Sequence, residues 1–360
     1  MQNLQQSSQQ NQIKKPKEFS FNLISKYRAV LMGTSIITIT ILHHLLVRQT
    51  QIPLGFCGKT FMTLIADGGV EIFLMLSGLG CYYSFKKNSS TKTFWLRHFP
   101  RILIPYFIFV TPFFIAVDFI AHKNGILAFF KDLTFYSNFS QGNISFWYPF
   151  LILFCYILMP FFFELFEKSP CRQSDYSLLM IFFTFFLSIN LLIFVGNRTF
   201  FYRIEIWLQR FFPFVLGVFF GKQSYHNEKF SKKFIFVMIL SAFLVFIQFK
   251  FCNIHVVSRN IVGLFCVTLC ALLVLFLEFL EKVAPKFQKA ICKFFGALGK
   301  ITYELYLSHL FVQSCLNHFG LWTGYFKFYA LELAISVLVS VAVHFALKPL
   351  YKVIDKKLSK

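Results

Sequence analysis

The sequence predicts an all-α fold, namely a polytopic membrane helix bundle. Hydrophobic residues make up 57% of the 360 residues, and 54 residues are Phe, which is more apolar surface than a soluble domain of this length can bury. The apolar runs reach the length of about 17–25 residues that a membrane-spanning helix needs. The alternating apolar and polar pattern of a transmembrane barrel is absent, so we expect the spans to be helices.

Ten apolar segments are candidate spans. They cover residues 29–47, 65–85, 102–121, 146–166, 177–196, 203–221, 233–251, 260–280, 299–318 and 327–348. The sixth is less regular because it contains Arg210 and Pro213, and the ninth contains Glu304 and His309. These limits predict a disordered polar tail over 1–26, a membrane domain over 27–350 and a basic C-terminal tail over 351–360.

The basic residues predict the orientation of the spans. Lys and Arg outside the spans total 26 on the side of the N-terminus and 9 on the opposite side. Because cytoplasmic loops carry the excess of Lys and Arg, both termini are expected in the cytoplasm. The same excess accounts for most of the net charge of +21, so we expect the lipid bilayer rather than nucleic acid as the partner of these charges.

The cysteines carry no metal or redox pattern. The nine cysteines lie mostly singly in apolar runs, and no C-x-x-C pair is present. This distribution indicates buried apolar residues rather than disulfides or metal ligands, so we expect no metal site.

Ionisable residues occur inside several spans, and they fall at a similar depth. Such residues are costly in a membrane and usually face the interior of a bundle or a wet cavity. His43 lies 15 residues beyond Arg28, which at 1.5 Å per residue places it roughly 22 Å into the membrane, in the outer half. Glu71, Arg210 and His309 are expected near the same layer. A shared layer favours one common site over scattered polar residues.

His43 and His44 are adjacent, and they point about 100° apart on a helix. Only one of them can face a narrow site, and the other is expected to bond a neighbouring carbonyl or hydroxyl group. A His with a carboxylate nearby can move protons at neutral pH, so with Glu71 this region favours an enzyme. The alternative is that an intramembrane His only bonds a neighbouring helix.

Six segments in a fixed order carry a further pattern. They are MGTSIITITILHH (32–44), GGVEIFLMLSGLGCYYSFKK (68–87), FWLRHFPRILIPY (94–106), SFWYPFLILFCYILMP (145–160), RFFPFVLGVFFGK (210–222) and LGKITYELYLSH (298–309). Together they resemble the membrane acyltransferases of the acyltransferase-3 family, from about residue 25 to 350. The resemblance implies ten spans and transfer of an acyl group, often acetyl, from acyl-CoA to a carbohydrate hydroxyl. It implies acyl-CoA as a co-substrate without a bound cofactor, and the cytoplasmic membrane of a bacterium as the location.

The resemblance also implies site residues. The essential His near the outer end of the first span corresponds to His43, ten residues after Gly33, and the acidic residue corresponds to Glu71, where Asp is more common. Many members carry an Arg at the position of Met32, and Arg28, one helical turn earlier, is the candidate to replace it. Many members also carry an additional esterase-like domain, so separate glycan-synthesis proteins are possible partners here.

The acyl donor is cytoplasmic and carries phosphates, so basic residues on the inner side are the candidates to bind it. The candidates are Arg28, Lys86, Lys87, Lys92, Arg97 and Arg101. The positive-inside rule alone also predicts such a cluster, and both interpretations stand.

On the outer side, His43 is expected to take the proton of the acceptor hydroxyl, with Glu71 orienting its ring. Transient acylation of His43 is the alternative. Arg210 would stabilise the oxyanion or hold a sugar oxygen. Further candidates for catalysis or acceptor binding are His44, His309 and Trp147.

Two interpretations stay open beside these assignments. Trp147 and Tyr148 either stack on a sugar ring or belong to an aromatic belt at the membrane interface, which is the commoner use. Three functions stay open for the whole protein. The first is an O-acyltransferase of a cell-surface glycan or its lipid-linked precursor. The others are a transporter or flippase and an inactive partner of a glycan synthase. The sequence lacks the internal repeats often seen in transporters, which favours the enzyme.

Overall fold

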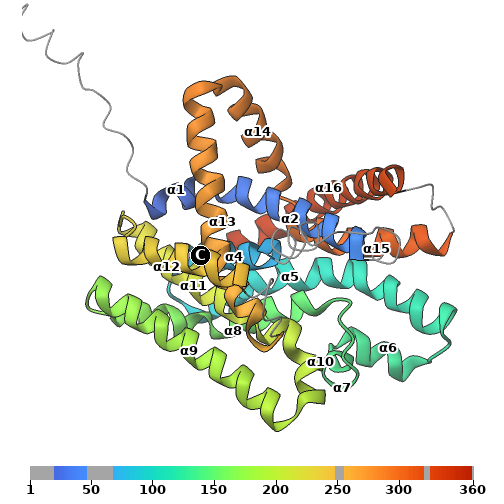
Figure 1. The fold of residues 1–360 in the computed structure, drawn as a ribbon. Coiled ribbons are helices and arrows are strands. Elements are labelled where there is room, and N and C mark those ends of the chain that lie inside the picture. Colours follow the sequence, from blue (N-terminus) through green and yellow to red (C-terminus); the bar gives the residue numbers. More distant parts are fainter. Residues whose placement is uncertain (1–19, 47–67, 248–254, 320–324, 359–360) are drawn as a thin grey trace, which may run out of the picture.

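The computed structural model describes residues 20–46, 68–247, 255–319 and 325–358. Within these ranges every named secondary-structure element is a helix (Figure 1). The helices are α1 Phe21–Lys26, α2 Arg28–Leu46, α4 Gly68–Lys87, α5 Thr91–Phe114, α6 Ile126–Leu133, α7 Tyr136–Ser140, α8 Trp147–Lys168, α9 Arg172–Gly196, α10 Arg198–Leu208, α11 Phe211–Tyr225, α12 Lys232–Ile247, α13 His255–Val283, α14 Pro285–Leu298, α15 Thr302–His318 and α16 Tyr325–Leu358. Helix α5 continues as a π-helical segment over Ile115–Ala121.

Six helical stretches in the described chain are long and apolar enough to cross a membrane. They are Thr91–Ala121, Trp147–Lys168, Arg172–Gly196, Arg198–Tyr225, Arg259–Val283 and Lys327–Leu358. The other four expected spans coincide with helices α2, α4, α12 and α15, apart from the parts that fall outside the described residues. An all-α membrane helix bundle is therefore confirmed, and the count of ten spans stays a prediction.

The ends of the chain differ from the expected tails. Residues 21–26 form α1, whose Phe21 and Ile24 are fully buried, so packed structure begins before residue 27. At the other end α16 continues through the expected basic tail as far as Leu358. The rest of the expected polar tail, residues 1–19, lies outside the described residues.

Helices α4 and α11 form the centre of the bundle because glycines let their backbones approach closely. A Cβ atom at Gly217 of α11 would lie 1.9 Å from the carbonyl oxygen of Met75, and one at Gly78 of α4 would lie 2.2 Å from that of Phe214. No other residue type fits at either position without moving a helix. Helices α2, α8 and α13 pack around this pair, so α4 and its Glu71 are held in the middle of the bundle.

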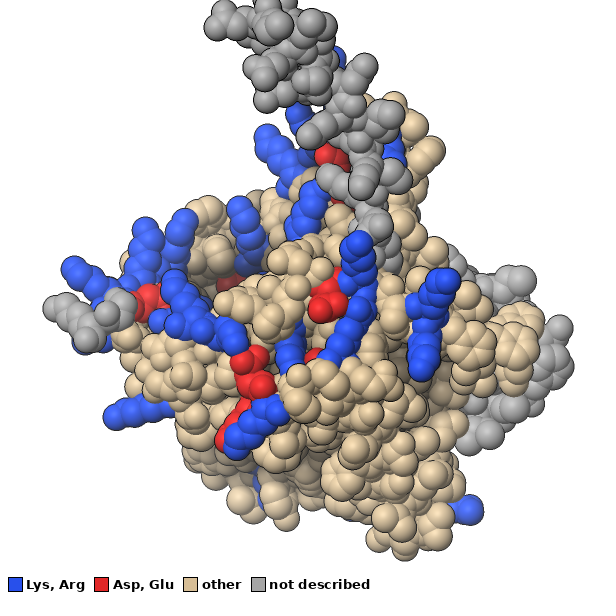
Figure 2. Space-filling model, turned by 90° about the vertical axis from the view of Figure 1, so that its left-hand side faces the viewer, with Lys and Arg blue, Asp and Glu red and all other residues tan. Residues whose placement is uncertain are grey.

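Lys and Arg gather on one face of the molecule. Figure 2 views the side on which α1 lies in Figure 1, and many Lys and Arg side chains but few acidic ones project from it. The positive-inside rule assigns such a face to the cytoplasm. The cytoplasmic position of the termini stays a prediction.

Candidate active site

His43 on α2 and His309 on α15 form a hydrogen-bonded pair. Nδ1 of His43 lies 2.7 Å from Nε2 of His309, and the stacked rings have centroids 5.0 Å apart. His309 is fully buried, whereas His43 is half-buried. The structure thus joins the expected catalytic His to His309, which the sequence analysis names only as a further candidate.

The hydrogen bonds of this pair determine which nitrogen atoms carry protons. Nδ1 of His309 lies 2.9 Å from the carbonyl oxygen of Leu305, which can only accept, so Nδ1 is the donor. In a neutral ring Nε2 of His309 is then an acceptor, and the proton between the two rings belongs to Nδ1 of His43. Nε2 of His43 therefore carries a lone pair. This is the tautomer of a general base whose second nitrogen is held by a partner.

His44 points to another neighbour. Its Nδ1 lies 3.3 Å from a carboxylate oxygen of Glu332 on α16, and both side chains are buried. The adjacent histidines thus face different helices, as their separation of about 100° predicts. The described partner of His44 is a carboxylate, and a bond of His44 to a carbonyl or hydroxyl group stays a prediction.

Glu71 and Arg210 form a buried ion pair at the centre of the bundle. Nε of Arg210 donates to a carboxylate oxygen of Glu71 at 2.9 Å, and the side chains are 3% and 0% exposed. Arg210 lies between α10 and α11, where the expected sixth span is interrupted. The ring of His43 contacts His309, and the described contact of Glu71 joins it to Arg210, so the expected orientation of His43 by Glu71 stays a prediction.

Trp147 and Tyr148 lie inside the bundle at the start of α8. They are 5% and 3% exposed, so they do not belong to a lipid-facing aromatic belt. The guanidinium of Arg210 lies over the ring of Trp147, 4.9 Å from its centroid. Trp147 therefore supports the ion pair as a cation–π partner and is not open to a sugar ring in this structure.

A chain of aromatic rings connects the histidine pair with α4. The rings of His43 and Tyr306 are 6.5 Å apart, and Tyr306 lies 5.3 Å from Tyr148. Tyr148 in turn lies 5.3 Å from Phe73 in an edge-to-face arrangement. Edge-to-face and tilted contacts at these distances are the favourable ones for aromatic rings, so the four side chains hold one another in place.

A cavity with a volume of about 500 Å³ adjoins this chain of rings. Phe73 and Tyr148 line one part of it. Its lining includes three cationic side chains, Arg28, Arg101 and Lys300, together with His98, His344 and the acidic Glu304. The volume is within the range of about 300–1,000 Å³ that small-molecule sites occupy, and the basic lining suits an anion.

One face of α2 connects this cavity with the histidine pair. Arg28 and Met32 line the cavity, Ile36 and Ile39 follow, and His43 lies at the far end. Residues three and four positions apart share a helix face, so these five side chains form one stripe. At 1.5 Å per residue the stripe is roughly 22 Å long. The cavity and the pair thus lie on opposite sides of the bundle's middle.

Arg28 reaches the cavity because Gly80 on α4 has no side chain. Nε of Arg28 donates to the carbonyl oxygen of Leu76 at 2.9 Å, and a Cβ atom at Gly80 would lie only 2.4 Å from the guanidinium. Met32, where the resemblance predicts an Arg, lines the same cavity one turn away. The structure therefore places the guanidinium of Arg28 in the cavity that an Arg at position 32 would also face.

Only two of the expected donor-binding residues, Arg28 and Arg101, line the cavity. Lys86 forms an ion pair with Glu167. Arg97 and Arg101 both contact Asp355 on α16, at 3.3 and 2.8 Å. Lys87 and Lys92 are exposed at the adjacent ends of α4 and α5. These other four basic residues are not part of the cavity lining.

Three ionisable residues of the cavity were missed as candidates in the sequence. His98 lies between Arg97 and Arg101 in FWLRHFPR, and Lys300 opens LGKITYELYLSH, so both stood inside segments that carry the family pattern. Nothing in the sequence distinguishes either residue from the basic residues that topology alone requires. His344 bonds Glu304 at 3.0 Å, and its position in the apolar last span was the available signal.

The comparisons with known proteins agree with this fold. A family model described as an acyltransferase domain matches residues 30–347, nearly the whole chain. A multi-pass helix bundle with this match is a membrane acyltransferase. The chain belongs to the acyltransferase-3 family. No match was found among curated proteins or among solved structures.

Proposed function

We propose that this protein moves an acyl group from acyl-CoA to a hydroxyl group of a carbohydrate of the cell envelope. One observation carries the proposal: the basic cavity and the His43–His309 pair are joined by the rings of Phe73, Tyr148 and Tyr306. A phosphate-rich donor can lie at one end of this path and a base at the other.

The donor binds through its phosphates. Positive charge comes from Arg28 on α2, from Arg101 on α5 and from Lys300 between α14 and α15. Arg binds phosphate through forked hydrogen bonds and Lys as a point charge, so the three together favour a multiply charged anion. The thioester end of the donor then extends past Ser77 and Phe73 towards His43.

His43 acts as the general base. The acceptor hydroxyl gives its proton to Nε2 of His43 as its oxygen forms a bond to the thioester carbonyl carbon. The carbon–sulfur bond then breaks, and the imidazolium returns the proton to the departing thiolate. His309 holds Nδ1 of His43 throughout, which keeps the lone pair on Nε2. A base of this kind contributes about 10²–10⁴-fold.

Glu71 and Arg210 position the site rather than react. The guanidinium is held by Glu71, by the carbonyl oxygen of Ile206 and by the ring of Trp147. These contacts fix the break between α10 and α11 against α4 and α8. In a membrane, such a break is tolerated only where protein surrounds it.

The test is acyl transfer by the purified protein in lipid nanodiscs. Acetyl-CoA labelled in the acetyl group is supplied with the envelope glycan fraction of the source cells, and alkali-labile label in the glycan is measured. His43→Ala should lower the rate by about 10²–10⁴-fold. His122→Ala, a change at an exposed His next to the π-helical segment, should leave it unchanged. Absence of consumption of both acetyl-CoA and propionyl-CoA by the unaltered protein with every glycan fraction would overturn the proposal in favour of a transporter or flippase.

A further inference from the structure

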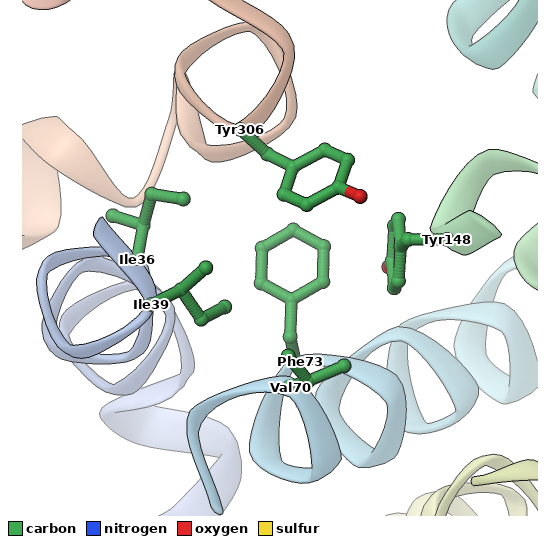
Figure 3. A pocket seen from close by; sticks show the side chains of 6 residues that line it. All are labelled: Ile36, Ile39, Val70, Phe73, Tyr148 and Tyr306. Carbon is green, nitrogen blue, oxygen red and sulfur yellow. The ribbon is translucent and has the colours of Figure 1, made fainter. Parts of the chain in front are cut away.

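A second, much smaller cavity lies between the basic cavity and the histidine pair. Six side chains from four helices surround it, as Figure 3 shows. They are Ile36 and Ile39 of α2, Val70 and Phe73 of α4, Tyr148 of α8 and Tyr306 of α15. The phenyl ring of Phe73 points into the middle of the group, between the two tyrosine rings and the two isoleucines (Figure 3).

The size and lining of this cavity suit one small apolar group. Its volume is about 10 Å³, which is close to the smallest cavity that can hold a single water molecule. Water in such a place also needs polar partners, and this surface is apolar, so water is a poor occupant. A methyl group is about the size of a water molecule and needs no hydrogen bond.

The position of the cavity relates it to the reaction. Phe73 and Tyr148 line both this cavity and the basic cavity, so the two adjoin. On the other side, the ring of Tyr306 lies 6.5 Å from that of His43 and 5.8 Å from that of His309. A group in the small cavity therefore lies between the proposed donor site and the proposed base.

We propose that this small cavity receives the methyl group of the acetyl thioester and limits the donor to acetyl-CoA. This inference rests on the proposed function, and it names the acyl group on which the enzyme acts. The extra methylene of a propionyl group would meet Val70, Ile39 or the ring of Phe73, all of which are held by surrounding helices. One methylene in such a pocket changes kcat/KM by about 10–200-fold.

The test compares acetyl-CoA with propionyl-CoA as donors. Val70→Ala removes two methyl groups from the wall of the cavity. It should raise the ratio of kcat/KM for propionyl-CoA to that for acetyl-CoA by about tenfold or more. Val215→Ala is the matched control, because Val215 is equally buried on α11 but lines neither cavity. Its ratio should equal that of the unaltered protein.

The outcomes separate this inference from the proposed function. Absence of transfer from both acetyl-CoA and propionyl-CoA by the unaltered protein would remove the proposed function itself. Acetyl transfer with equal use of propionyl-CoA, or an unchanged ratio in Val70→Ala, would overturn the acetyl pocket and leave the proposed function standing. If Val70→Ala fails to fold, Ile39→Val removes a single methyl group from the same wall and decides between the outcomes.

Discussion

Replacement of His309 by Ala tests the proposed chemistry most directly. The change removes the acceptor that lies 2.7 Å from Nδ1 of His43 and leaves the basic cavity intact, since His309 is not part of its lining. Nδ1–H of His43 then loses this acceptor, and the contact that fixes its tautomer is removed. The expected defect is in the chemical step rather than in donor binding.

The size of the defect follows from that one hydrogen bond. A buried donor without its acceptor costs about 1–3 kcal/mol. Since 1.36 kcal/mol is a factor of ten in rate, kcat should fall by roughly 5- to 150-fold. That is less than the loss expected for His43→Ala, because the base itself is still present. KM for acyl-CoA should stay within about twofold of its value in the unaltered protein, because His309 does not line the cavity.

The assay is steady-state acetyl transfer in nanodiscs, with thermal unfolding followed in parallel. His309→Gln is the informative partner variant, because its amide oxygen can accept from Nδ1 of His43 and should restore most of kcat. If His309→Ala keeps full kcat, the pair has no part in the reaction. Equal losses in the Ala and Gln variants, in step with unfolding temperature, would indicate that His309 only supports packing.

Two further substitutions test the supporting contacts. Gly80→Ala places a Cβ atom 2.4 Å from the guanidinium of Arg28, so KM for acyl-CoA should rise roughly tenfold as that charged group is displaced. Gly296→Ala on α14 is the control, because an added Cβ there would meet no atom of another helix within 4 Å. It should leave KM unchanged, and a rise in KM would refute the steric argument. Glu71→Gln should lower the free energy of unfolding by about 3–5 kcal/mol, measured by denaturant titration in detergent, because it removes the carboxylate facing Arg210. A second change, Arg210→Met, should recover much of that loss, and no recovery would contradict the ion-pair explanation.

The helices could be predicted from the sequence because a membrane makes their signal strong. Apolar runs of spanning length, interrupted by basic loops, locate each segment without knowledge of its neighbours. The sixth span shows the limit of this reasoning. Arg210 and Pro213 marked it as irregular, but the break into α10 and α11 depends on Glu71, which is 139 residues away in sequence. The start of packed structure at Phe21 was missed because a six-residue helix carries little hydropathy signal.

The sequence predicted that several ionisable residues share one depth, but it could not predict their pairings. The common depth of His43, Glu71, Arg210 and His309 follows from counting along each span. Which of them face each other depends on the rotation of each helix about its own axis, and that is set by packing. The sequence therefore does not show that His309 contacts His43, the expected base. The basic residues of the cavity could not be identified from the sequence, because membrane topology and phosphate binding both require Lys and Arg.

The stripe along α2 has a consequence for the permeability barrier of the membrane. Between Met32 and His43 its members are Ile36 and Ile39, and the space beside them admits one small apolar group rather than a file of water molecules. A charged group moving through this constriction would meet part of the membrane potential, and moving one charge across the whole of it costs about 2.3 kcal/mol per 100 mV. A neutral acyl group would pass without that cost, while the phosphates and protons of the basic cavity stay on their own side.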